Sequence, residues 1–189
     1  MTTHQKTRSI YIAGPLFSEA ELCFNRAVKE ILKKSFDVYL PQEDGELLDN
    51  TIQTGGDVCA AIKRIFHADV AAIKRCDTIL VILDGRTIDE GAAFELGVAY
   101  TLGKTCLGLQ TDPRRLLKTG NNPMIAYPIE HVFSSLRELE VWAVHQHHFR
   151  EEHSQNRRYL INNDEEERKS YSTIHYHSLL SASSKDLFK

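Results

Sequence analysis

The residues best suited to chemistry in this chain lie between Asp84 and Gly97, in the segment DGRTIDEGAAFELG. The segment follows a short, β-branched apolar run at 78–83, which predicts a buried strand. Carboxylates, a glycine and two alanines then lead into a predicted helix that carries Glu95. Open α/β sheets bind their ligands where a strand gives way to a helix. We therefore expect Glu95 to face a pocket for a small polar molecule, as a nucleophile or a base.

The local sequence around Glu95 leaves two interpretations open. Glu95 lies within about two turns of the predicted helix start, where the helix dipole favours an ionised carboxylate by about 0.3–1 kcal/mol. Ala92 and Ala99 share its helix face and leave space above it. The alternative is a solvated surface glutamate, which is the usual state of glutamate in a helix. Asp89 has an ordinary alternative too, because it precedes the helix and fits an N-cap.

Three further residues have side chains suited to a binding site. Tyr11 lies at the end of the first predicted strand, beside Gly14, where a core tyrosine is the structural alternative. Asp69 lies among alanines on a long predicted helix, where a surface charge is the alternative. Asn122 begins an Asn-Pro-Met turn, and turns commonly use asparagine for structural reasons alone. Each residue alone therefore fits either a functional or a structural role.

Strands and helices alternate along the first 148 residues, with short connections between most of them. Strands are predicted at 9–13, 37–40, 78–83, 105–110 and 130–133, and helices at 18–34, 57–75, 90–102 and 134–147. This alternation predicts a flavodoxin-like three-layer α/β/α sandwich with a parallel five-stranded sheet. The second helix should pack through an apolar stripe of Val58, Ile62, Ile65, Phe66 and Ile73.

Two segments fall outside this alternation. Residues 41–56 are polar and rich in turns, and a connection of that length suggests a functional lid. From about Phe149 the sequence is charged and poor in aliphatic residues, which predicts a polar C-terminal extension, weakly ordered or docking a partner. The predicted organisation is thus a domain at 1–148 and an extension at 149–189, with no second domain.

Composition narrows the classes of function. A formal net charge of −3 gives no overall basic surface for nucleic acid. No apolar run of about 18 residues occurs and the first ten residues lack a signal-peptide core, so we expect a cytoplasmic protein without a membrane partner. The cysteines lack metal-site spacing, so we expect reduced thiols and no bound metal at Cys23, Cys59, Cys76 and Cys106.

Taken in order, several segments resemble one protein family. The segments are YIAGP at 11–15, Asp69, Asp84 with Gly85, DEGAAFELG at 89–97, and Gly103 with Lys104. Their order and spacing are similar to those of the nucleoside 2-deoxyribosyltransferase family, over about residues 8–140. The pattern D-x-G-x-A-F-E-L-G is the most specific part of the resemblance. Asn122-Pro123-Met124 resembles an Asn-x-Met segment that a neighbouring subunit contributes to the active site in that family.

The resemblance implies transfer of a 2-deoxyribosyl group between nucleobases, with Glu95 as the nucleophile of a covalent glycosyl-enzyme. It implies that Asp69 handles the proton of the base and that Tyr11 positions the nucleophile. The substrate-binding residues that it implies are Gly14, Phe17, Asp84, Asp89, Gly91 and Asn122. The expected partners are deoxyribonucleosides, free nucleobases and other copies of the chain in a homo-oligomer with shared active sites. No cofactor is expected.

Two other functions stay open. A 2'-deoxynucleoside 5'-phosphate N-hydrolase would use the same nucleophile and pass the sugar to water. Such relatives commonly have a serine where this chain has Asp89, and a carboxylate there would repel a phosphate. The second alternative is a non-catalytic nucleotide-sensing module, which would not need Glu95, Asp69 and Tyr11 together.

Overall fold

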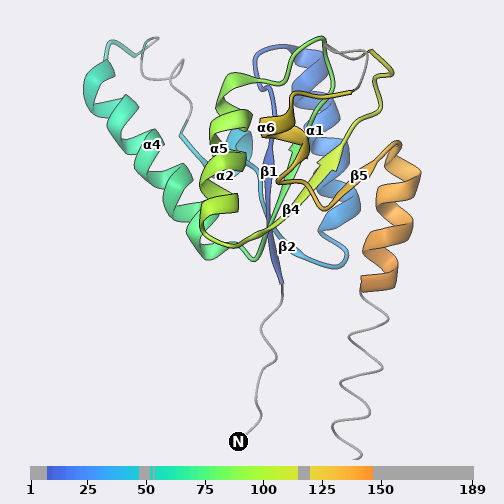
Figure 1. The fold of residues 1–189 in the computed structure, drawn as a ribbon. Coiled ribbons are helices and arrows are strands. Elements are labelled where there is room, and N and C mark those ends of the chain that lie inside the picture. Colours follow the sequence, from blue (N-terminus) through green and yellow to red (C-terminus); the bar gives the residue numbers. More distant parts are fainter. Residues whose placement is uncertain (1–7, 47–51, 53, 115–119, 147–189) are drawn as a thin grey trace, which may run out of the picture. The chain divides into compact units, whose positions relative to one another are not determined.

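One parallel sheet organises the part of the chain that the computed structural model describes, which is residues 8–46, 52, 54–114 and 120–146 (Figure 1). The strand order is β2-β1-β3-β4-β5, and each neighbouring pair is parallel. The strands are β1 (Ser9–Ala13), β2 (Asp37–Tyr39), β3 (Thr78–Ile82), β4 (Thr105–Leu109) and β5 (His131–Phe133). The predicted parallel five-stranded sheet is therefore confirmed.

Helices cover both faces of this sheet. On one face, α1 (Glu19–Leu32) and the helix at 136–146 pack against alternate strand residues in a core that includes Ile10 and Leu80. On the other face, α4 (Val58–Arg75) and α5 (Glu90–Thr101) close a second core. Because successive strand residues point to opposite faces, β1 to β4 supply residues to both cores, whereas β5 supplies Phe133 to the first. The three-layer α/β/α sandwich predicted from the sequence is confirmed.

The long connection after β2 is not an open loop throughout. Its first part forms a short helix, α2 (Pro41–Asp44), while residues 47–51 and 53 lie outside the described ranges. The Asn25 amide on α1 donates to Gln42 Oε1 at 2.9 Å, and Lys29 pairs with Asp44 at 2.9 Å. The start of the predicted lid is therefore fastened to α1. A second short helix, α6 (Pro123–Ala126), interrupts the connection after β4.

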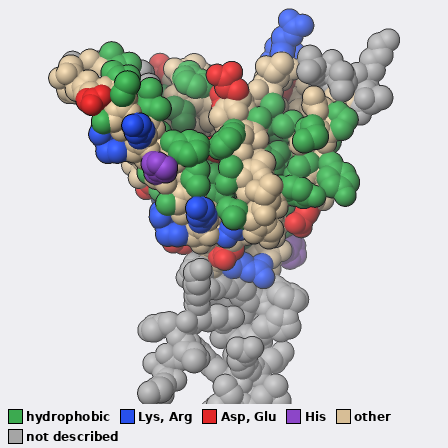
Figure 2. Space-filling model, turned by 60° about the vertical axis from the view of Figure 1, so that its left-hand side comes forward, with side chains coloured by type: hydrophobic (Ala, Val, Ile, Leu, Met, Phe, Trp, Pro, Cys, Tyr) green, Lys and Arg blue, Asp and Glu red, His purple; other side chains and the backbone are tan. Residues whose placement is uncertain are grey.

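The apolar stripe predicted on α4 is buried only in part. Ile73 is buried at the C-terminal end of the helix, whereas Val58, Ile62 and Phe66 are exposed. Figure 2 shows hydrophobic side chains gathered on this face of the molecule. The apolar stripe did not predict burial along the whole helix, because the N-terminal half of α4 extends beyond the sheet (Figure 1). No helix in the described ranges is long and apolar enough to span a membrane.

The order of the strands places a binding crevice at the ends of β1 and β3. The chain leaves β1 for β2 on one side and reaches β3 on the other, and such switch points are where open α/β sheets hold ligands. Gly14 follows β1 directly, and a Cβ atom there would lie 3.0 Å from Ile82 Cβ. Glycine therefore lets the two strand ends approach. The predicted boundary after residue 148 and the extension at 149–189 lie outside the described residues.

Candidate active site

A hydrogen bond between the sheet and α5 lies at the centre of the candidate site. The Tyr11 hydroxyl donates to Glu95 Oε1 at 2.6 Å, which joins residues 84 positions apart in the chain. The Tyr11 ring is fully buried in the core beneath α4 and α5. Tyr11 is thus a core tyrosine, as its sequence context allowed, and its hydroxyl contacts Glu95.

Burial controls the protonation of Glu95. It raises the pKa of Glu95 to about 8; the hydrogen bond from Tyr11 acts in the opposite direction, and the charges of Asp69 and Asp89 raise the pKa further. The helix dipole typically supplies about 0.3–1 kcal/mol, which is less than the roughly 1.4 kcal/mol of a single pKa unit. The dipole alone is therefore too weak to offset the effect of burial on Glu95.

Asp69 faces the same pocket from α4. Burial raises its pKa to about 6, so Asp69 is not the simple surface charge that its sequence context also allowed. The pocket has a volume of about 320 Å³, within the range typical of small-molecule sites. It lies between α4 and α5 and is lined by Ile62, Ile65, Phe66, Asp69, Val70, Ile73, Gly91, Phe94 and Glu95.

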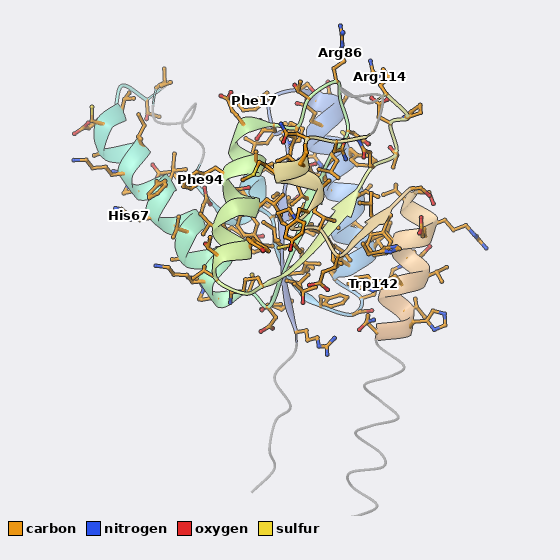
Figure 3. The ribbon with its side chains drawn as sticks, viewed as in Figure 1. Phe17, His67, Arg86, Phe94, Arg114 and Trp142 are labelled. Atoms are coloured by element: carbon orange, nitrogen blue, oxygen red, sulfur yellow. The ribbon has the colours of Figure 1, made fainter. Side chains whose placement is uncertain are left out.

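Most of the remaining pocket wall is apolar and aromatic. Phe94 projects from α5 towards α4 (Figure 3). Its ring centroid lies 5.9 Å from that of Phe66 on α4. The charged side chains in the lining are those of Glu95 and Asp69. An apolar pocket with a few convergent polar groups suits a flat, weakly polar ligand such as an aromatic heterocycle.

Asp89 has the structural role considered for it, and its substrate-binding role stays a prediction. Its Oδ2 accepts a hydrogen bond from the Ala92 backbone N–H at 2.9 Å, which makes it the N-cap of α5. Its charge also raises the pKa of Glu95, six residues further along the chain. Gly91 lines the pocket, and a Cβ atom at this position would lie 3.1 Å from Asp89 Oδ2. The small residue at 91 therefore leaves room for the Asp89 carboxylate next to it.

Apart from Gly91, the substrate-binding residues implied by the resemblance do not line this pocket. Both carboxylate oxygens of Asp84 hold the loop after β4, accepting from Thr111 Oγ1 at 2.5 Å and from the Asp112 backbone N–H at 2.8 Å. Phe17 precedes α1 and is 80% exposed (Figure 3). Gly14 contributes backbone geometry at the end of β1. Contacts between these residues and a substrate therefore stay predictions.

Asn122 lies on a different pocket from Glu95 of the same chain. Its Oδ1 accepts from the Met124 backbone N–H at 2.9 Å, so it caps α6. It lines a cavity of about 240 Å³ at the ends of β3 and β4. Arg86 and Arg114 also line this cavity and project from neighbouring loops (Figure 3). Asn122 is therefore not brought to the carboxylates within one chain.

Tyr39 is the main residue near the site that sequence reasoning missed. It lies beside Tyr11 in the parallel pairing of β1 and β2. The two rings stack with centroids 5.4 Å apart and planes inclined by 14°. A signal was present in the sequence, because each tyrosine is the third residue of its strand and parallel pairing from the strand starts aligns them.

The described residues offer few other reactive groups. Within the described ranges, no three His, Cys, Asp or Glu side chains are arranged to hold a metal ion together. The cysteines are free thiols, of which Cys76 and Cys106 are buried and Cys23 and Cys59 are exposed. The pocket groups able to exchange a proton or attack a carbon atom are therefore the carboxylates of Glu95 and Asp69.

A parallel α/β sheet with a buried carboxylate at the β1/β3 switch point defines a class of proteins that bind small molecules at this edge. Within this class the chain belongs to the nucleoside 2-deoxyribosyltransferase family, because a sequence model of that family matches residues 10–166. The family resemblance of the sequence motifs is thus confirmed.

Solved structures agree with this membership. A conserved protein from Enterococcus faecalis V583 is 31% identical, with a TM-score of 0.61 over 75% of this chain and 99% of that protein. A 2-deoxyribosyltransferase from Bacillus psychrosaccharolyticus is 25% identical, with a TM-score of 0.56 over 70% and 90%. A 2-deoxyribosyltransferase from Leishmania mexicana is also 25% identical, with a TM-score of 0.50 over 73% and 98%. Comparison with curated proteins gives no match.

Replacing Glu95 with glutamine should stabilise the folded protein, and the gain should grow with pH. The Glu95 carboxyl has an ordinary pKa of 4.5 and a folded-state pKa of about 8. Between these values only the unfolded state releases the proton, so wild-type stability falls as the pH rises. We expect Glu95→Gln to differ little from the wild type at pH 5. At pH 8.5 it should be more stable by at least about 1.4 kcal/mol in urea unfolding.

Glu90→Gln is the matched control for this experiment, because Glu90 is exposed in the first turn of the same helix. It should show no gain that increases with pH. A Glu95→Gln gain that is the same at pH 5 and pH 8.5 would contradict the raised pKa.

Proposed function

We propose that the protein transfers the 2-deoxyribosyl group between nucleobases through a covalent intermediate on Glu95. The observation that supports this most directly is the Tyr11–Glu95 hydrogen bond at the edge of a pocket shared with Asp69. A Glu95 oxygen would form a bond to the anomeric carbon while the bond from that carbon to the base nitrogen breaks. The bonding pair goes to the base, which takes up a proton. A second base then reverses these steps, with net retention of configuration.

The two carboxylates have properties suited to these different tasks. A carboxyl with a pKa of about 6, such as Asp69, can give a proton to a leaving base near neutral pH and recover one from the incoming base. Tyr11 would stabilise the ionised form of Glu95. Asp89, whose carboxylate lies near Gly91 of the pocket lining, would accept hydrogen bonds from the sugar hydroxyls. Similarity to two 2-deoxyribosyltransferases supports transfer as the reaction.

Incubation of the protein with deoxyinosine and adenine should produce deoxyadenosine, detected by chromatography. With deoxyinosine alone, mass spectrometry should show the protein carrying one deoxyribosyl group. Glu95→Ala should lose both the exchange and the adduct, whereas Glu90→Ala, on the exposed side of the same helix, should keep both. An adduct that persists in Glu95→Ala would place the nucleophile elsewhere. Failure to exchange any pair of purines or pyrimidines would argue against transfer.

The free nucleoside should be preferred to its 5'-monophosphate, which separates transfer from the hydrolase alternative. A phosphate near Asp89 would bring like charges together, at about 4 kcal/mol per unit pair 4 Å apart with an effective dielectric of about 20. Solvent reduces this penalty, so we expect catalytic efficiency on deoxyinosine to exceed that on its monophosphate by at least about tenfold, or roughly 1.4 kcal/mol.

Asp89→Asn tests the cause of this preference, because asparagine caps a helix as well as aspartate and removes only the charge. The ratio of efficiencies on the nucleoside and the monophosphate should fall in this variant. Equal or faster release of base from the monophosphate by the wild type would favour the hydrolase.

The active site is further proposed to be completed by a second copy of the chain. Asn122 and Glu95 line different pockets within one chain, so an Asn122 that contacts the sugar must come from a neighbour. Large hydrophobic side chains are also exposed along α4, α5, α6 and β5, a pattern that marks interaction surfaces (Figure 2). They include Ile62, Phe66, Phe94, Tyr100, Leu102, Met124, Tyr127 and Val132.

Complementation between two inactive variants would test this sharing of sites. Glu95→Ala and Asn122→Ala should each be inactive alone. When they are co-expressed, half of the dimers are mixed, and each mixed dimer has one site with both native residues, so about a quarter of wild-type activity should return. Light scattering of the wild type should show a dimer or larger. No recovery on co-expression, or an active monomer, would contradict the shared site.

A further inference from the structure

Tyr39 and Tyr11 form a matched pair on adjacent strands. They are direct partners in the parallel register of β2 and β1, and their rings stack at 5.4 Å. Both pack into the core on the sheet face that α4 and α5 cover. Tyr11 extends its hydroxyl to Glu95 on α5. Tyr39 lies one strand further out, on the edge strand β2, and borders α4.

The Tyr39 hydroxyl lies in the region of Asp69. Ala72 on α4 lines the same hollow as Tyr39, and Asp69 lies three residues earlier on the same helix face. Burial raises the pKa of Tyr39, and the Asp69 charge is the next largest cause. A Cβ atom at Gly45 would lie 3.4 Å from the Tyr39 hydroxyl. The hydroxyl therefore lies beside the end of α2 and within the electrostatic influence of Asp69 on α4.

Neither group has a competing partner among the described residues. The Tyr39 hydroxyl and the Asp69 carboxylate make no hydrogen bond there, although Tyr11 and Glu95 bond to each other at 2.6 Å. A phenol and a carboxylate, both partly buried and both without a protein partner, are suited to interact when the site is used. A tyrosine required only for stacking would need no hydroxyl.

We propose that Tyr39 is a positioning residue for Asp69, as Tyr11 is for Glu95, and that its hydroxyl donates to the Asp69 carboxylate as the base departs. The inference rests on the proposed function. When the bond to the base nitrogen breaks, its electron pair stays on the base and the Asp69 proton moves to that base. The carboxylate that remains accepts the hydrogen bond of Tyr39, directly or through one water. The incoming base returns a proton to Asp69 in the second half of the reaction.

The test compares two 2-deoxyribosyl donors, of which one has a leaving group that must be protonated and the other has a leaving group that need not be. Hypoxanthine leaves deoxyinosine with a proton from the enzyme, whereas a 2-deoxyribosyl donor with a 4-nitrophenolate leaving group needs none. Tyr39→Phe keeps the stacked ring and removes only the hydroxyl. We expect it to lose at least about tenfold in kcat/KM for base release from deoxyinosine, as for a hydrogen bond to a charged group. On the nitrophenolate donor the loss should stay below about twofold.

Tyr11→Phe is the matched control, because Glu95 attacks both donors and the loss should be similar for each. A purely structural role of Tyr39 would also slow both donors equally in Tyr39→Phe, and that result would overturn the inference. Unchanged release from deoxyinosine would overturn it as well. A wild type that cleaves neither donor would instead refute the proposed function, and with it this inference, so the two failures are distinguishable.

Discussion

The candidate site depends on one hydrogen bond, from the Tyr11 hydroxyl to the Glu95 carboxyl. A buried carboxyl without a partner costs about 1–3 kcal/mol or more, and Tyr11 is the donor that satisfies Glu95. The bond requires β1 to lie beneath α5, which follows from the strand order, and it requires the ends of β1 and β3 to approach closely, which Gly14 permits. The order of the strands in the sheet therefore also determines the position of Tyr11 relative to Glu95.

Much of the fold follows from local sequence. The β-branched runs and the alternation of strands with helices predicted every layer of the sandwich, and Asp89 is the N-cap that its position suggested. The family motifs also named the residues that the pocket brings together, Glu95, Asp69 and Gly91, although their roles stay proposals. These features could be predicted because hydrophobic periodicity and helix caps depend on residues only a few positions apart in the chain.

Properties set by distant contacts were not predictable in this way. The dipole argument for Glu95 used only its own helix, whereas its pKa is set by burial beneath α4 and by Asp69, 26 positions earlier. The pairing of Tyr39 with Tyr11 depends on strand register. The two oxygens of Asp84 bind a loop 27 and 28 residues away, which no local pattern indicates. Exposure of Ile62 and Phe66 depends on how far α4 extends beyond the sheet.

Under the proposed reaction, one proton must move between Glu95 and Asp69. With pKa values of about 8 and about 6, Glu95 holds the proton at pH 7, whereas attack needs Glu95 ionised and Asp69 protonated. The two pKa units between them cost about 3 kcal/mol. As the base leaves, positive charge develops on the sugar beside Glu95, and one unit pair 4 Å apart gains about 4 kcal/mol at an effective dielectric of about 20. The ionised form of Glu95 is therefore favoured in the transition state and not before it, which is the condition under which an interaction accelerates a reaction.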